Sequence, residues 1–496
     1  MSRNRHLNSF IAQFPFEGLT FDDVALVTRY ADFLPDDASI QTRLTSRISA
    51  NIPFVSAAMD TVTESRMAIA MAMLGGIGVI HKNLPAETQA EQVDMVKRHL
   101  HGLIIDPVVF RVSDTLDKVR ATRREHGYGF SGFPILNADD TLAGILTSKD
   151  TKFARDTDAR IDSVMTSDVV SAAPGTTLQE AYDIMMKNKL GKLPLLDKGK
   201  LVGLYAFSDV KNLVEDVQPM YNRDDEYRLR VAAAVSGGNY ERAELLANAH
   251  VDIIVIDSAH GHSSGIIDMV RWLTKTFPDI DVIAGNVGTA AGAVALRDAG
   301  AHAIKVGIGP GSICTTRVVC GVGVPQISAV YHCATALEGS IPVIADGGIR
   351  HSGDVPKAIV AGAETVMLGS ILAGTQESPG EKILHQGRQY VVYRGMGSLA
   401  AMRESLGSRE RYSQAQTRDD ELVPQGIEGI VPYAGTVEKV MTQFCGGLRS
   451  SMGYCGCKSV DELQTGGEFV RISMAGLSES HPHDVKIMKE APNYRS

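Results

Sequence analysis

The amino-acid sequence predicts an α/β protein: a (β/α)8 TIM barrel of parallel strands with a smaller domain inserted into it. Eight short apolar runs recur along the chain with helical patterns between them. Most of these runs are apolar throughout, which is typical of parallel strands covered on the outside by helices. A barrel takes about 250 residues, whereas this chain has 496, including 48 glycines that suit the turns of such an enzyme. The excess length predicts a further domain.

The predicted strands follow one another at regular intervals except at one place. About 150 residues separate the second run from the third, far more than a helical crossover needs. We therefore expect residues 1–106 to form the first part of the barrel, 107–215 the insert and 216–496 the second part. The eight runs are Pro53–Ala57, Gly76–Ile80, Val231–Val235, Asp252–Ile256, Asp281–Ala284, Ala303–Val306, Pro342–Ala345 and Thr365–Leu368.

The insert contains an internal repeat, with units at about 107–156 and 164–215. Phe133–Leu136 followed by Gly144–Asp150 is echoed by Leu193–Leu196 followed by Gly203–Asp209, with the same spacing from glycine to aspartate. Two units are too few for a solenoid and are expected to pack against each other. The arrangement resembles a tandem pair of CBS motifs (a Bateman domain), which implies regulatory binding of ATP or GTP. The alternative is a structural or oligomerising insert without a ligand.

Composition and charge exclude several classes of protein. The chain has 49 basic and 58 acidic residues, a formal net charge of −9, and so lacks the basic excess typical of nucleic-acid binding. No apolar run reaches 18 residues and the N-terminus has no signal-peptide pattern, so we expect a cytoplasmic protein without a membrane partner. The six cysteines lack zinc-ligand spacing and are expected to be free thiols.

The loops after the predicted strands carry the candidate functional residues, because barrel active sites form at the carboxyl ends of the strands. Gly347–Gly348 and Gly369–Ser370 follow the seventh and eighth strands, where barrels commonly hold phosphate on main-chain N–H groups. Tight turns are the alternative explanation. Asp346 could accept hydrogen bonds from sugar hydroxyls, or could instead cap a helix.

Cys314 stands out in the loop after the sixth strand. Three glycines and a proline precede it and two threonines follow it, so the segment is too polar and flexible for core packing. A thiolate in such a loop can add to an electron-poor carbon and later leave. The alternative is the common buried, structural cysteine; we expect the other five cysteines to be structural.

Four motifs identify a resemblance to the IMP dehydrogenase/GMP reductase family. They are Gly307–Gln326, Ile344–Arg350, Tyr393–Ser398 and Ser56–Thr63, and the similarity extends from Leu19 to Arg495. The resemblance implies an NAD-dependent oxidoreductase that converts IMP to XMP, the committed step of guanine nucleotide synthesis. Cys314 would attack C2 of the purine, hydride would pass to NAD, and the thioimidate would be hydrolysed after NADH departs.

The resemblance also implies a mobile flap at residues 407–430 that brings Arg411 and Tyr412 to the intermediate. Arg411 would activate the water, and Thr316 and Tyr412 would hold it. Because arginine normally stays protonated, that role rests on the resemblance and not on ordinary basicity. Without it, Arg411 and Tyr412 would be taken for a solvated pair on an exposed loop.

The remaining site residues are implied by matching positions in the family. The nucleotide would contact Met59, Ser312, Asp346, Gly348, Gly369, Ser370, Tyr393, Gly395, Met396, Gly397 and Gln425. NAD would contact Asp257, Ser258, Asn286, Gly307 and Gly309. Potassium (K+) would be held by carbonyls of Gly309, Gly311 and Cys314 together with Glu479, Ser480 and His481 of a neighbouring subunit in a homotetramer, or in an octamer formed through the insert.

Two other functions compete with IMP oxidation. A GMP reductase shares the barrel and the cysteine loop, but the Arg411–Tyr412 flap, the CBS insert and Gln425, where the reductase requires glutamate, argue against it. A CBS nucleotide sensor on an inactive barrel is the other alternative. The presence of Cys314, Thr316 and Arg411 together argues against that reading.

Overall fold

The computed structural model describes residues 4–15, 17–99, 103–104, 107–125, 132–152, 158–215, 220–488 and 491–494. It divides into two compact units, one formed by Met1–Lys97, Met220–Asn222 and Leu229–Ser496, the other by Arg98–Pro219 and Arg223–Arg228. No helix among the described residues combines the length and the apolar character needed to cross a bilayer.

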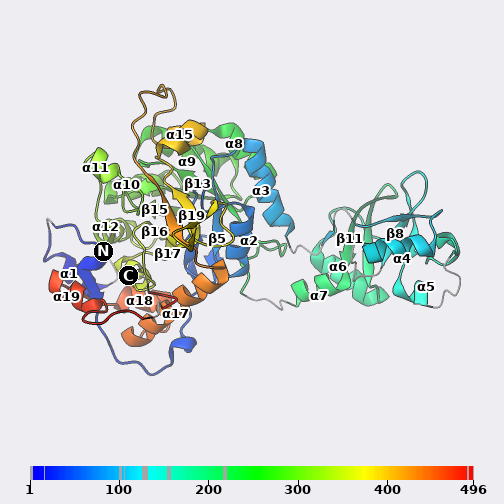
Figure 1. Cartoon of the computed structure of the whole chain (residues 1–496), viewed down its shortest axis with the longest axis horizontal. Coiled ribbons are helices and arrows are strands. Elements are labelled where there is room, and N and C mark those ends of the chain that lie inside the picture. The colour runs from blue at the N-terminus through cyan, green and yellow to red at the C-terminus, as the bar shows by residue number, and fades with distance from the viewer. Residues whose placement is uncertain are drawn as a thin grey trace. The chain divides into compact units, whose positions relative to one another are not determined.

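The larger unit is a closed barrel of eight parallel strands (Figure 1). Neighbouring strands follow the order β12-β13-β14-β15-β16-β17-β4-β5. The predicted barrel is confirmed, and each of the eight apolar runs supplies one strand. Their bounds are β4 (Phe54–Ser56), β5 (Ile77–Ile80), β12 (Ala232–Val235), β13 (Ile253–Asp257), β14 (Asp281–Val287), β15 (Ala303–Val306), β16 (Val343–Asp346) and β17 (Thr365–Leu368).

Helices surround the strands and bury their outer faces. The apolar side chains alternate along β13: Ile253 and Val255 belong to the cluster inside the barrel, and Ile254 and Ile256 to the cluster between strands and helices, as period-two strands require. The covering helices are α2 (Ser65–Met73), α3 (Ala86–Arg98), α8 (Tyr240–Asn248), α9 (Ser264–Thr276), α10 (Ala290–Asp298), α12 (Gln326–Leu337), α13 (Asp354–Ala361) and α17 (Val437–Cys455).

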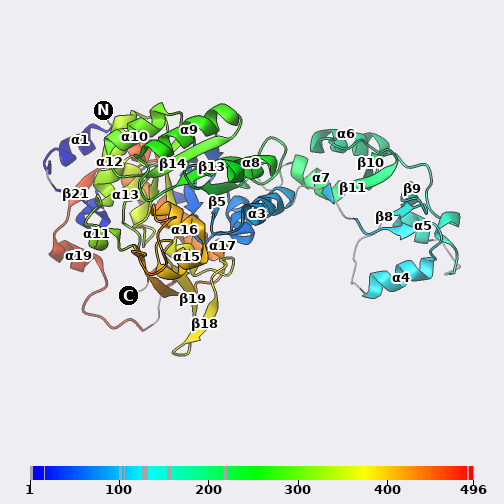
Figure 2. The same ribbon diagram turned by 90° about the horizontal axis from the view of Figure 1, so that it is seen from above.

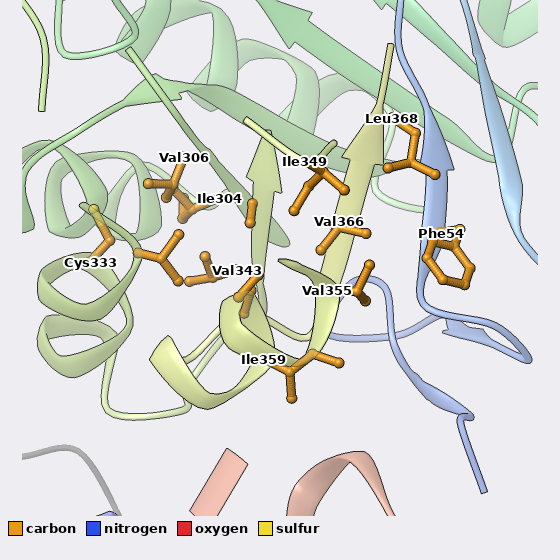
Figure 3. Packing of buried hydrophobic residues seen from close by; sticks show 14 of the residues in the cluster. Phe54, Ile304, Val306, Cys333, Val343, Ile349, Val355, Ile359, Val366 and Leu368 are labelled. Atoms are coloured by element: carbon orange, nitrogen blue, oxygen red, sulfur yellow. The ribbon is translucent and has the colours of Figure 1, made fainter. Parts of the chain in front are cut away.

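Figure 3 shows part of this outer core, where Val343 and Val366 of the barrel face Val355 and Ile359 of α13. Cys333 of α12 lies in the same layer and is fully buried. Burial raises the pKa of its thiol to about 12. Cys333 is therefore an inert packing residue, as expected for it.

Shorter elements extend the barrel at its ends. The β18–β19 hairpin projects away from it in Figure 2, and β20 pairs with β19. Two helices, α15 and α16, lie between β19 and β20 in the chain. The bounds are α1 (Arg5–Ile11), β1 (Val24–Leu26), β2 (Thr42–Arg43), β3 (Ser49–Ala50), α11 (Thr316–Val319), α14 (Ser370–Ala373), β18 (Lys382–His385), β19 (Arg388–Arg394), α15 (Leu399–Glu404), α16 (Leu406–Arg411), β20 (Glu428–Pro432), α18 (Val460–Gly466), β21 (Phe469–Arg471) and α19 (Met474–Ser480).

The smaller unit contains two copies of one arrangement, each with its own apolar core. In the first copy Phe110 pairs in parallel with Ile135, and Thr166 pairs antiparallel with Ile145. In the second, Ala172 pairs in parallel with Leu195, and Ile104 antiparallel with Leu204. The elements are β6 (Leu103–Ile104), β7 (Phe110–Arg111), α4 (Leu116–Glu125), β8 (Phe133–Leu136), β9 (Leu142–Leu146), α5 (Ser148–Lys152), α6 (Leu178–Asn188), β10 (Lys192–Asp197), β11 (Lys200–Ala206) and α7 (Phe207–Val214).

The pairing of β6 with β11 explains why this unit begins at Arg98 and not at the predicted residue 107. A segment that precedes the first copy completes the sheet of the second. Residues 106 and 216, which adjoin the predicted boundaries, lie outside the described residues, as do 126–131 and 153–156 of the first predicted repeat, residue 157 after it, and Arg495.

Candidate active site

The loops at the carboxyl ends of the barrel strands enclose a cavity of about 340 Å³. The structure brings most of the predicted nucleotide residues to its wall, although they come from positions between 59 and 425 of the chain. The predicted residues that line it are Met59, Asp257, Asn286, Gly307, Gly309, Gly311, Ser312, Cys314, Asp346, Gly348, Gly369, Ser370, Tyr393, Gly395, Met396, Arg411, Tyr412 and Gln425. A cavity of this size suits a small organic ligand.

Cys314 is half-buried in this wall, two residues before the start of α11. Its Sγ lies 3.1 Å from Oγ1 of Thr316, and Thr316 Oγ1 donates to Oε1 of Gln425 at 3.0 Å. The main chain repeats the link, because Thr315 N donates to Gln425 O at 3.0 Å. A thiol, a hydroxyl and a flap amide are thus joined in one row. Cysteine at this position is placed for reaction with a ligand, unlike Cys333, Cys455 and Cys457, which are buried.

Backbone conformation and close neighbours require glycine at three positions of the predicted phosphate loops. Gly347 and Gly348 have φ of +92° and +84°, a left-handed backbone that side chains disfavour. A Cβ on Gly369 would lie 3.0 Å from the Tyr393 hydroxyl, so only glycine leaves that hydroxyl open to the cavity. Burial raises the pKa of Tyr393 above its usual value, which keeps the hydroxyl protonated and able to donate.

Asp346 does not cap a helix, since α13 begins at Asp354. Its Oδ2 accepts hydrogen bonds from Asn286 Nδ2 at 2.8 Å and from Lys305 Nζ at 2.9 Å. The carboxylate is therefore held in a fixed orientation at the cavity wall. The helix-cap alternative is therefore excluded. The role of Asp346 as an acceptor for sugar hydroxyls stays a prediction.

A buried charge network lies behind the wall. Lys305 is 1% exposed, and its Nζ donates to Asp257 Oδ1 at 2.9 Å. Arg411 forms an ion pair with the other oxygen of Asp257. Burial alone would raise the pKa of Asp257, but Arg411 and Lys305 hold it well below its usual range. The aspartate is therefore ionised, and its charge is balanced by buried cations.

Arg411 and Tyr412 do not form a solvated pair, because both line the cavity and the Arg411 side chain is only 15% exposed. Burial works against the charged form of Arg411, but the carboxylate of Asp257 raises the pKa of the guanidinium above its usual value. Nε of Arg411 has no hydrogen-bond partner among the described residues. The guanidinium is thus a buried cation that Asp257 holds at the cavity wall.

The flap covers part of the predicted NAD site. Arg411 holds Asp257, and the carbonyl of Arg411 accepts from Ala259 N at 3.1 Å. Ser258 does not line the cavity; its hydroxyl donates to Gly285 O at 3.0 Å. Arg411 of the flap therefore occupies one carboxylate oxygen of Asp257, and a ligand that bound that oxygen would have to displace Arg411.

The structure does not bring the predicted cation ligands together within one chain. Glu479, Ser480 and His481 are exposed at the end of α19, and His481 Nδ1 lies 3.0 Å from the Tyr494 hydroxyl. Gly311 O already accepts from Cys314 N at 3.1 Å. Within the described residues, no group of three or more His, Cys, Asp or Glu side chains could hold a metal ion.

Sequence reasoning missed Lys82 and Lys305. A lysine in the middle of the apolar run Ala303–Val306 was the available signal, because a buried lysine needs a partner. Lys82 is also buried, and its Nζ donates to Asp257 O at 2.7 Å. Burial lowers the pKa of Lys82 to about 7, although Asp257 opposes this.

A barrel cavity lined at the carboxyl ends of its strands by a loop cysteine, two glycine loops and a buried arginine has the composition of an enzyme active site. Comparison with known proteins agrees with this class. Residues 18–483 match the model described as the IMP dehydrogenase / GMP reductase domain, and the chain belongs to that family.

Curated relatives resemble the chain over nearly its whole length. It is 51% identical to the inosine-5′-monophosphate dehydrogenase of Bacillus subtilis, with 97% of this chain and 99% of the relative covered, and 50% identical to that of Escherichia coli, with 97% and 98% covered. Among solved structures, a GMP reductase variant from Trypanosoma brucei in complex with guanosine 5′-monophosphate has a TM-score of 0.80 at 38% identity, covering 96% of this chain and 100% of that one.

Proposed function

We propose that this chain oxidises IMP to XMP with NAD, through a covalent intermediate on Cys314. The observation that carries the proposal is the convergence of Cys314 and the flap pair Arg411–Tyr412 on one cavity that also contains the glycine loops, with Thr316 Oγ1 3.1 Å from the Cys314 sulfur. The near full-length similarity to inosine-5′-monophosphate dehydrogenases supports it.

In the proposed complex the phosphate lies on the main chain at Gly348 and Gly369, with the hydroxyls of Ser370 and Tyr393 beside it. Asp346, oriented by Lys305 and Asn286, accepts from the ribose hydroxyls. Met59 lines the same cavity, with its sulfur 3.8 Å from the Tyr393 hydroxyl, and would lie under the base. This arrangement places C2 of the purine over the sulfur of Cys314.

The first half of the reaction forms the bond between sulfur and C2. Asp257, Asn286 and Gly309 on the same cavity wall would hold NAD, which would supply the acceptor for the hydride that leaves C2. Potassium, held by main-chain carbonyls of the cysteine loop, would order that loop; carbonyl oxygens are suitable donors for such a cation.

The second half needs water at the same carbon. Because the Thr316 proton is committed to Gln425 Oε1, the Thr316 oxygen can accept a hydrogen bond from the attacking water. Arg411, on the same cavity wall, can stabilise the negative charge that develops as the water attacks. Arg411 and a bound dinucleotide compete for Asp257, so the two halves occur in different flap positions.

GMP reduction is the second candidate, since the family and the solved relative include GMP reductases. The insert no longer argues against it, because the match to the T. brucei reductase covers 96% of this chain and therefore includes the insert. Gln425 still does: it accepts from Thr316, whereas an amide cannot exchange the proton that a carboxylate would.

One spectrophotometric assay separates the candidates. We expect NADH to appear when the chain is mixed with IMP and NAD. Loss of NADPH in the presence of GMP would instead show that the chain is a GMP reductase. Absence of both reactions would favour the alternative that it is a nucleotide sensor on an inactive barrel.

For the smaller unit we propose a CBS pair that binds ATP or GTP and controls association of a homotetramer into an octamer. The two copies with equivalent strand pairing support this. Sedimentation of the full chain with ATP, with GTP and without nucleotide tests it. Identical sedimentation in all three conditions would indicate a purely structural insert.

A further inference from the structure

Ser408 and Asn83 join the flap to the barrel at a point away from the cavity. Ser408, in α16, is completely buried although its neighbours are polar. Asn83 follows β5. Nδ2 of Asn83 donates to Ser408 Oγ at 2.8 Å, and Ser408 Oγ donates to Asn83 Oδ1 at 3.0 Å. The pair thus exchanges two hydrogen bonds, and the single hydroxyl is used both as donor and as acceptor.

The barrel fixes the orientation of Asn83. Nδ2 of Asn83 also donates to Asp60 Oδ2 at 2.9 Å. The same oxygen of Asp60 accepts from Arg394 Nε at 3.1 Å and from Arg394 Nη2 at 2.8 Å. A carboxylate only accepts, so the amide nitrogen must face Asp60, and the amide oxygen is then turned toward Ser408. The side chain of Asn83 is therefore already positioned when the flap arrives.

The same helix carries Arg411 three residues after Ser408. Residues at this spacing lie on one face of a helix. The approach of the helix to the barrel is close, because a Cβ on Gly407 would lie 2.9 Å from the Lys82 carbonyl. Lys82 in turn donates to the carbonyl of Asp257, the partner of Arg411. The segment Lys82–Asn83 thus contacts the flap helix and also supports the residue that Arg411 binds.

We propose that Asn83 and Ser408 form a latch that holds the flap closed on the cavity and so act as positioning residues for hydrolysis of the covalent intermediate. The inference rests on the proposed function. Neither residue lines the cavity, so the latch acts only through Arg411. Formation of the sulfur–carbon bond and hydride transfer, which require an open flap, do not need it.

The test uses full-length Ser408→Ala, Asn83→Ala and the double variant. Rapid mixing with IMP and NAD measures the NADH burst, and steady-state assays measure kcat. We expect an unchanged burst rate and amplitude and a fall in kcat of about three- to tenfold, the size expected for a lost hydrogen-bonded pair. Inhibition by excess NAD should begin at lower concentration, because a weakened flap competes less well for Asp257.

The double variant should be no slower than the slower single variant, because both substitutions break one interaction. Thr417→Ala is the control: Thr417 lies in the same flap and contributes main-chain groups to it, so its kcat should match wild type. A burst that falls with kcat, an unchanged kcat, or multiplicative effects in the double variant would each overturn the latch. Failure of wild type to release NADH from IMP and NAD would instead refute the proposed function.

Discussion

Arg411 makes two connections to the end of β13 and the loop after it, and also lines the cavity: it forms an ion pair with Asp257, and its carbonyl accepts from Ala259 N. We predict that Arg411→Ala releases NADH in a normal burst and then turns over about 100-fold more slowly or worse, the range of a lost catalytic group. Burst and steady-state kinetics measure both steps.

Arg418→Ala is the matched control in the same flap, because Arg418 is 72% exposed and forms an ion pair with Asp420, which is itself exposed. Its kcat should stay close to wild type. Unchanged turnover in Arg411→Ala would remove Arg411 from the mechanism.

Lys82 links stability to pH. Burial lowers its pKa to about 7, against about 10.4 in an unfolded chain. Between these values the unfolded state binds more protons, so stability rises with pH by up to about 1.4 kcal/mol per unit. We predict that, from pH 7 to pH 9, the free energy of unfolding of wild type rises relative to that of Lys82→Met. Urea unfolding of both proteins at each pH measures this, and parallel curves would contradict the prediction.

The sequence predicted individual site residues best where a residue type conflicts with its surroundings. Cys314 in a glycine loop is such a case. Lys305 in an apolar strand is a second, and a buried role could have been predicted for it from the sequence. The pairing of Arg411 with Asp257 could not be predicted from the sequence in the same way. Nothing local to either residue specifies a partner far along the chain; the closed barrel and the flap bring them together.

At the scale of elements, the flap and the β19–α15 connection fit against each other at Gly397. A Cβ there would lie 2.6 Å from Cζ of Tyr412, so alanine must displace the tyrosine ring. We predict that Gly397→Ala keeps the NADH burst but lowers kcat by about tenfold, since the clash disfavours only the closed flap.

Gly429→Ala is the control, because a Cβ at Gly429 meets nothing within 4 Å. Its NADH burst and its steady-state kcat should both match those of wild type. A lost burst in Gly397→Ala would show that the glycine serves nucleotide binding and not flap closure.

The barrel strands were predictable because burial on both faces makes each one apolar throughout, a signal that needs no long-range information. The helix α16 was not predicted as an element. Its six residues, Leu406–Arg411, have no apolar periodicity, and their position depends on bonds from Ser408 and Arg411 to distant loops. Short polar elements of this kind are specified by tertiary contacts and not by local pattern.

At the scale of the whole molecule, the barrel closes without residues of the insert, since all eight strands belong to the larger unit. The chain leaves and re-enters that unit at neighbouring points: Lys97 Nζ donates to Leu229 O at 3.3 Å, and Arg230 N donates to Asn222 O at 2.9 Å. Replacing residues 98–219 with a short Gly-Ser linker should therefore preserve the barrel, as insertion sites with adjacent ends allow.

We predict that this shortened chain oxidises IMP with a kcat and KM within about threefold of wild type, because none of the cavity residues is removed. ATP and GTP should no longer change its sedimentation. The control is the full chain measured in the same buffers. A folded but inactive shortened chain would show that the insert takes part in catalysis, and nucleotide-dependent association that survives the deletion would place the nucleotide site on the barrel.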